Sequence, residues 1–118
     1  MSNVIVVGSS NTDLVFETPK FPAEGETVIG GDFEVISGGK GANQAVAAAR
    51  AGADVLFLTK VGDDEFGSNA IAVYNKEGIN TSFIEKQKGV ASGTAMIMVN
   101  QNSGENAIIV APGANNHL

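Results

Sequence analysis

The residues best suited to chemistry lie in segment 37–45, which reads Ser-Gly-Gly-Lys-Gly-Ala-Asn-Gln-Ala. Glycine lets the backbone approach a ligand closely, and the segment leads into an alanine-rich stretch that predicts a helix. Backbone N–H groups at a helix start, the ammonium of Lys40 and the carboxamide of Asn43 together favour an anionic or strongly polar ligand. We therefore predict a polar ligand site here. The alternative is a glycine-rich helix entry that packs tightly under a sheet.

Neither common nucleotide-binding pattern fits this segment. A P-loop needs glycine, four residues and then Gly-Lys-Ser/Thr, whereas Glu34 occupies the first glycine position and Gly41 follows the lysine. The dinucleotide pattern Gly-x-Gly-x-x-Gly is missing after the first predicted strand, where Gly8 is followed by Ser-Ser-Asn. The segment is therefore not a P-loop.

Asn11 and Asp13 follow the apolar run 4–7, which predicts a buried strand. Open α/β sheets bind ligands just beyond the carboxyl ends of their strands. Two residues separated by one can point to the same side of an extended chain, and a carboxylate with a carboxamide can both accept and donate hydrogen bonds. This combination suits adjacent sugar hydroxyls. The alternative is an Asx turn that bonds only its own backbone.

Two further candidates are weaker. Asp63-Asp64-Glu65 could offer carboxylates to a hard metal ion, but acidic residues also satisfy free N–H groups at a helix start, which is the interpretation we favour. The single histidine, His117, has no carboxylate or serine beside it, so we expect no catalytic role for it. No nucleophile–base pair can be assembled, and no metal site is predicted.

The composition excludes several classes of protein. The 118 residues suit one domain, and the absence of cysteine rules out disulfides and thiolate metal sites. The net charge of −6 and scattered basic residues argue against nucleic acid as a partner. No apolar run approaches the roughly 20 residues of a membrane span, and the N-terminus lacks a signal-peptide pattern. We expect a cytoplasmic protein.

The predicted elements place these residues at the edge of a sheet. The apolar run 4–7 and the buried-strand pattern of 54–62 predict parallel strands, and the helix 42–51, ended by Gly52, would connect them. A second helix is predicted over 65–77 and would end at Gly78.

The other segments predict a second type of sheet. Alternating polar and apolar residues are typical of a sheet with one face in water, and a turn-rich loop at 100–104 predicts a hairpin. We expect no closing element at 115–118. The expected strands are 13–17, 27–29, 32–37, 81–85, 93–99 and 105–110.

Taken together, the sequence resembles the ribokinase-like (PfkB) carbohydrate kinases along essentially its whole length. The run Gly-Gly-Lys-Gly-Ala-Asn-Gln-Ala followed by an alanine-rich helix is similar to the N-terminal signature of that family. The other matching segments are 6–13, 22–27, 61–67 and 111–115.

The resemblance implies an α/β fold, namely a three-layer α/β/α ribokinase-like fold with a small β-sheet lid. Residues 1–118 would form the N-terminal part of one such domain. The fold would be incomplete, because the family's C-terminal half is absent from this sequence. The lid strands would be interleaved at about 13–18, 27–37, 94–99 and 105–110.

The resemblance also implies a function. Asn11 and Asp13 match the family residues that hold sugar hydroxyls, and Gly39, Lys40 and Asn43 match those that close the other side of the sugar. Family members transfer the γ-phosphate of ATP, with Mg²⁺ and commonly a monovalent cation such as K⁺, to a sugar hydroxyl. Here the expected acceptor is the 5-hydroxyl of D-ribose, and the lids of two copies would pack together in a homodimer. The catalytic, ATP and cation sites would all lie in the absent half.

Two alternatives stay open. The sugar could instead be fructose or a keto-deoxy sugar, or the substrate could be a nucleoside. Residues 1–118 could also act alone as a non-catalytic sugar-binding or dimerisation module. An isolated piece of this length would expose a sheet edge, so we expect it to self-associate.

Overall fold

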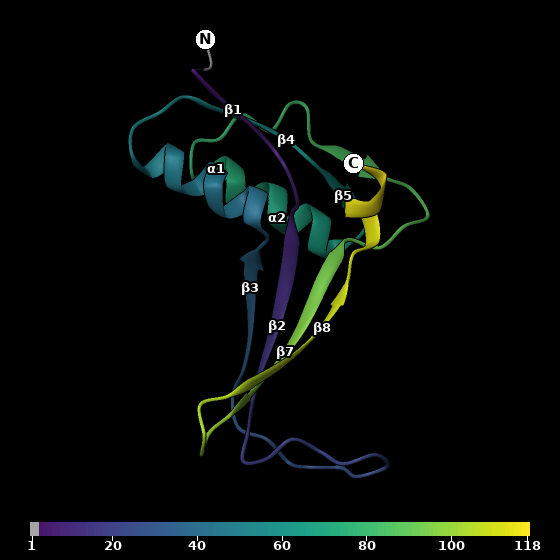
Figure 1. Cartoon of the computed structure of the whole chain (residues 1–118). Helices are drawn as coiled ribbons and strands as arrows, with labels where there is room; N and C mark the ends of the chain where they lie inside the picture. The colour runs from purple at the N-terminus through teal and green to yellow at the C-terminus, as the bar shows by residue number, and fades with distance from the viewer. Residues whose placement is uncertain (1–2) are drawn as a thin grey trace.

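The computed structural model describes residues 3–118 as two helices and several short strands (Figure 1). The chain passes twice between a helix-covered sheet and a second sheet that projects away from the helices. In order, the elements are β1 (Val4–Val7), β2 (Asn11–Thr18), β3 (Phe33–Gly38), α1 (Lys40–Arg50), β4 (Val55–Leu58), β5 (Lys60–Gly62), α2 (Glu65–Lys76), β6 (Glu85–Gln87), β7 (Gly93–Asn100), β8 (Asn106–Ala111) and a 3₁₀ helix (Gly113–His117).

The helix-covered sheet is parallel. β1 pairs with β4 in parallel from Val4–Val55 to Val7–Leu58. α1 lies between these strands in the chain and packs on both, as a crossover helix must. β5 and β6 form a separate two-stranded parallel sheet. The predicted single strand 54–62 is therefore divided at Thr59, which lies between β4 and β5.

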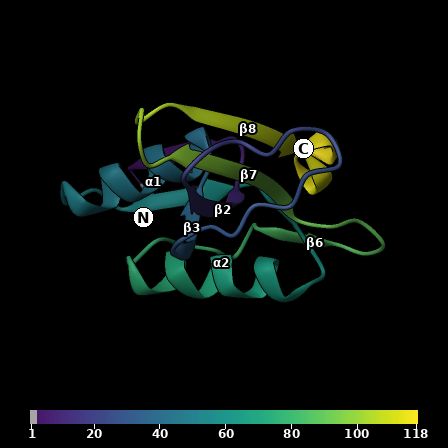
Figure 2. The ribbon, with the colours of Figure 1, turned by 90° about the horizontal axis from the view of Figure 1, so that it is seen from below.

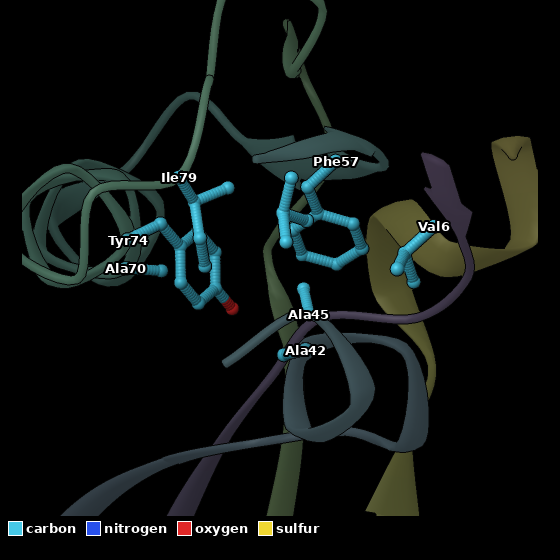
Figure 3. Packing of buried hydrophobic residues seen from close by; sticks show 8 residues of the cluster. Val6, Ala42, Ala45, Phe57, Ala70, Tyr74 and Ile79 are labelled. Carbon is cyan, nitrogen blue, oxygen red and sulfur yellow. The ribbon is translucent and has the colours of Figure 1, made fainter. Parts of the chain in front are cut away.

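Both helices pack on the same face of this sheet (Figure 3). Val6 of β1 and Phe57 of β4 lie against Ala45 of α1 and Tyr74 of α2 in one buried cluster. The ring of Phe57 meets that of Tyr74 edge-on, with 5.3 Å between centroids. Such aromatic pairs contribute about 0.5–1.5 kcal/mol beyond the area that they bury. Small alanines on α1 allow the helix to approach the strands closely.

The opposite face of the same sheet is open. Successive residues of a strand point to opposite sides, so Ile5 and Val7 face away from the helices. Their side chains are 63% and 65% exposed. Residues 3–118 therefore supply the sheet and one helical layer.

The second sheet has the strand order β3-β2-β7-β8, with the parallel pair β2–β7 at its centre and an antiparallel strand at each edge. Figure 2 shows these strands side by side from below. The predicted strands 13–18, 94–99 and 105–110 correspond to β2, β7 and β8, and the predicted hairpin joins the last two. That these strands form a lid stays a prediction.

The structure corrects three other expectations. Residues 27–32 form no strand. Instead the chain passes so close to β2 that a Cβ atom at Gly30 would overlap Glu17 O, and Gly31 N donates to the same oxygen. The short strand expected at 81–85 lies at 85–87, after a turn. The end of the chain is not open, since residues 113–117 form a 3₁₀ helix anchored by the buried Ala114, whose N–H donates to Ala91 O.

The two long helices begin and end close to their predicted limits. α1 starts at Lys40, two residues earlier than expected, and Gly52 follows its end with φ of 99°. Asp64 is the N-cap of α2 and accepts a hydrogen bond from Gly67 N, which confirms the capping interpretation of this acidic segment. Burial raises the pKa of Asp64, but hydrogen bonds from Ser92 and Gly67 outweigh that effect and lower it overall.

The first turn of α1 lies directly against the end of β1. A Cβ atom added at Gly41 would lie 2.6 Å from Gly8 C and 2.7 Å from Ser9 N, which are both backbone atoms. Ala42 N also donates to Ser9 O at 3.0 Å. The tight helix entry that was the alternative interpretation of segment 37–45 is therefore present, and it depends on glycine at both Gly8 and Gly41.

The contact between Gly41 and Gly8 predicts a change in stability opposite to the one that helix propensity alone would give. Alanine is favoured over glycine inside a helix by about 1 kcal/mol, yet Gly41→Ala should destabilise the protein by about 1–3 kcal/mol because the new methyl group meets backbone. Urea unfolding of the intact protein measures the difference. Gln44→Ala, an exposed position of the same helix, is the control and should be nearly neutral. Equal or greater stability of Gly41→Ala would contradict the proposed contact.

Candidate functional site

The candidate site lies where the chain leaves the parallel sheet and enters the second sheet. β1 ends at Val7 and β2 begins at Asn11, while β3 ends at Gly38 just before α1 begins. Asn11 is paired with Gly38 across the two strands. The carboxyl end of a parallel strand, the start of a helix and the root of the second sheet therefore meet, as expected for ligand sites in α/β folds.

Asn11 and Asp13 share one face of β2, as predicted from their spacing. The carboxylate of Asp13 is half-buried, and burial raises its pKa. Within residues 3–118 no side chain donates a hydrogen bond to it. A Cβ atom at Gly38 would overlap this carboxylate, so glycine at that position leaves the room that Asp13 occupies.

Gly39 brings the start of α1 to the same place. Its φ of 98° lies in the left-handed region that favours glycine. A Cβ atom there would lie 2.9 Å from Ser9 O and 3.0 Å from Asn11 N. Gly39 is the N-cap of α1 but has no side chain that could cap the helix. Its backbone packs directly beside β2, where a side chain would not fit.

The other two predicted site residues lie further along α1. Lys40 is exposed at the first helical position and forms no ion pair within residues 3–118. Asn43 is exposed and lines a groove of about 470 Å³ between α1 and α2 together with Ser37. No hydrogen bond joins Asn43 to Asn11 in the described part of the chain. The structure thus brings Asn11, Asp13 and Gly39 together, whereas a sugar contact of Lys40 or Asn43 stays a prediction.

Sequence reasoning missed a residue that contacts the site directly. Asn115, in the C-terminal 3₁₀ helix, donates from Nδ2 to Asn11 Oδ1 at 2.6 Å. Its Oδ1 accepts from Ser10 N at 3.0 Å, and its Nδ2 also lies 3.2 Å from Ser10 O. The only available signal was the matching segment 111–115, which gives no hint of a partner more than 100 residues earlier in the chain.

A second hydrogen bond connects the site to the hydrophobic core. Ser10 Oγ and Tyr74 Oη form a buried hydrogen bond across 2.5 Å. Burial raises the pKa of Tyr74, although the bond to Ser10 opposes this. The residue before Asn11 is therefore held by the side chain that also packs against Phe57.

A separate cavity of about 420 Å³ lies on the other face of the second sheet. Its walls are mainly apolar and include Phe16, Phe33, Met96 and Met98. Strand alternation and the register place these residues opposite to Asp13. This cavity offers few of the polar groups that a hydroxylated ligand needs, so we do not place the ligand there.

The arrangement around Asp13 is suited to binding and not to chemistry by itself. It offers an acceptor carboxylate, a carboxamide and close backbone, while the ammonium of Lys40 stands at the adjacent helix start. Residues 3–118 contain no cluster of three or more His, Cys, Asp or Glu side chains that could hold a metal ion. Neither helix in this part of the chain is long and apolar enough to cross a membrane.

Known proteins resemble this chain in both sequence and structure. It is 45% identical to a ribokinase of Bacillus subtilis over 118 residues, which are all of this chain and 40% of that protein. It is 48% identical to a deoxyribokinase of Salmonella typhi over 98% of this chain and 38% of that protein. The solved structure of an Arabidopsis thaliana ribokinase complexed with ribose and ATP superposes with a TM-score of 0.87 at 32% identity, over 97% of this chain and 37% of that one.

These similarities confirm the predicted ribokinase-like α/β fold. The chain spans about 40% of the length of these two curated relatives. The pattern of the pfkB carbohydrate kinases extends over residues 1–118 without interruption. The chain therefore belongs to the pfkB family of carbohydrate kinases.

Proposed function

We propose that this chain forms the sugar-binding part of an ATP-dependent kinase that converts D-ribose and ATP to D-ribose 5-phosphate and ADP. The observation that carries the proposal is the half-buried carboxylate of Asp13, which has no hydrogen-bond donor within residues 3–118 and stands beside Asn11. A ligand with hydroxyl groups can supply the hydrogen-bond donors that this carboxylate lacks within residues 3–118. Similarity to proteins named ribokinase supports ribose as that ligand.

Each of these residues has its own role in binding the sugar. The Asp13 carboxylate accepts hydrogen bonds from sugar hydroxyls, and the Asn11 carboxamide contacts a neighbouring hydroxyl. Gly39 lets the backbone approach the other side of the sugar, where Lys40 and Asn43 complete the site. The ammonium of Lys40 also stabilises negative charge near the transferred phosphoryl group.

The same proposal includes ATP, Mg²⁺ and a monovalent cation such as K⁺ as cofactors. ATP is present with ribose in the Arabidopsis relative. Residues 3–118 do not fit these groups, because they form no cluster of metal-ligating side chains and the sequence contains no P-loop. We therefore place their binding mainly outside residues 1–118 and derive no step through them.

We further propose a cytoplasmic homodimer in which the second sheet acts as a lid and packs against its copy. Exposed apolar side chains on both faces of this sheet support that assembly, since one face could cover the sugar and the other a partner. Among them are Ile36 and Val110 on the face of Asp13, and Val35 and Ile109 on the opposite face.

A second candidate substrate is 2-deoxyribose. The chain is as similar to a deoxyribokinase as to a ribokinase, with identities of 48% and 45%. The two sugars differ by one hydroxyl, so the kcat/KM of the intact protein for each sugar decides between them. A higher value for 2-deoxyribose would replace ribose in the proposal and leave the role of Asp13 unchanged.

Replacing the carboxylate tests the site directly. Asp13→Asn keeps the shape but loses the charged acceptor, which should lower kcat/KM for ribose roughly 10- to 150-fold, mostly through a higher KM. Glu17→Gln is the matched control, because Glu17 lies on the same face of β2 but further from α1, and it should behave as the unsubstituted protein. Full activity of Asp13→Asn would refute the proposed site.

The raised pKa of Asp13 also predicts a pH dependence. Sugar hydroxyls donate to the ionised carboxylate, so ribose affinity should be complete above the pKa of Asp13 in the free protein and fall as the pH drops through it. Because burial raises that pKa, the loss should begin at higher pH than for an exposed aspartate. Calorimetric titration with ribose from about pH 7 to 4 measures it. A profile identical to that of Asp13→Asn would contradict the prediction.

A further inference from the structure

We propose that Asn115 is a positioning residue that fixes the carboxamide of Asn11 with its NH₂ group turned towards the sugar. The inference rests on the proposed sugar-binding function and adds the direction of one hydrogen bond. It follows from a chain of contacts between the C-terminal 3₁₀ helix and the start of β2.

The backbone of Ser10 sets the orientation of the Asn115 amide. Ser10 N–H can only donate, so the Asn115 atom 3.0 Å from it must be the oxygen Oδ1. Nδ2 then lies at the other end of the amide, and it donates towards Ser10 O at 3.2 Å. One donor and one acceptor of the same residue hold both ends, which leaves no equivalent flipped arrangement.

Asn115 in turn sets the orientation of Asn11. The Nδ2 group of Asn115 can only donate, so the Asn11 atom 2.6 Å away must be its oxygen. The NH₂ group of Asn11 is left at the other end of the carboxamide, and it donates to no residue within 3–118. Asn11 therefore meets the ligand as a donor.

Gly93 provides the space for this contact. It is the residue of β7 paired with Asn11, and a Cβ atom there would lie 2.6 Å from Asn11 Oδ1 and would overlap Asn115 Nδ2. Any other residue would force the two carboxamides apart. The two carboxamides can therefore meet because glycine occupies the position of β7 that pairs with Asn11.

The result is a donor beside an acceptor on one face of β2. Asp13 can only accept when ionised, whereas the fixed Asn11 amide can only donate towards the ligand. A pair of sugar hydroxyls can satisfy both, one by donating to Asp13 and the other by accepting from Asn11. A freely rotating Asn11 would present the wrong end to the ligand for part of the time.

The substitution Asn115→Asp tests the inference in the intact protein. One carboxylate oxygen can still accept from Ser10 N, but the other faces Asn11 and makes the amide of Asn11 turn its NH₂ away from the sugar. We expect ribose affinity, measured by calorimetry, to fall roughly 10- to 100-fold, and KM for ribose to rise equally while KM for ATP stays unchanged. Asn116→Asp adds the same charge at an exposed neighbouring position and should change neither value.

A double substitution separates positioning from a general structural role. If Asn115 acts through Asn11, adding Asn115→Asp to an Asn11→Ala protein should cause little further loss of ribose affinity. Additive losses would overturn the inference, because they would show that Asn115 acts independently of Asn11. Should Asn115→Asp fail to fold, as judged by circular dichroism, Asn115→Ala takes its place and should lose roughly two- to tenfold in affinity.

The outcomes distinguish the inference from the proposed function. Unchanged ribose affinity in the folded Asn115 variant, with a loss in Asp13→Asn, would overturn the inference alone. No binding of ribose or 2-deoxyribose by the unsubstituted protein would overturn the proposed function, and the inference with it. Weaker ribose binding in Asn115→Asp that is non-additive with Asn11→Ala supports both.

Discussion

The close approach of the Gly8 and Gly41 backbones is the constraint on which the site depends. It lets the first turn of α1 rest on the end of β1, and the hydrogen bond from Ala42 N to Ser9 O holds it there. Gly39 is thereby brought to the start of β2. A side chain at either glycine would lift the helix away from the strand, and the ligand-facing groups of helix and strand would separate.

The site also shows how binding conflicts with stability. A half-buried carboxylate without a donor costs free energy in the folded protein, and burial raises the pKa of Asp13 accordingly. Gly38 leaves room for the Asp13 carboxylate but gives it no hydrogen bond, so this cost is not offset within residues 3–118. Local departures from favourable packing of this kind are expected at ligand sites, where the ligand supplies the missing partner.

Local patterns made β1, both helices and the β7–β8 hairpin predictable, because periodicity, caps and turn residues act over a few neighbouring positions. The spacing of Asn11 and Asp13 likewise predicted their common face. Three features could not be predicted in this way. Residues 27–32 follow a strand-like pattern but form no strand, and the segment 54–62 divides into two strands at Thr59. Asn115 finds its partner more than 100 residues earlier in the chain, where no local pattern can indicate it.

The parallel pairing of β2 with β7 has a consequence for biosynthesis. Asn11 pairs with Gly93, so the centre of the second sheet joins strands more than 80 residues apart, and loop closure over such a distance slows folding. A ribosome releases β2 and β3 well before β7 exists, which leaves the edge of β2 that will meet β7 unpaired for several seconds. Asn115 emerges later still. The contact that holds Asn11 thus forms only after a residue more than 100 positions later has been synthesised.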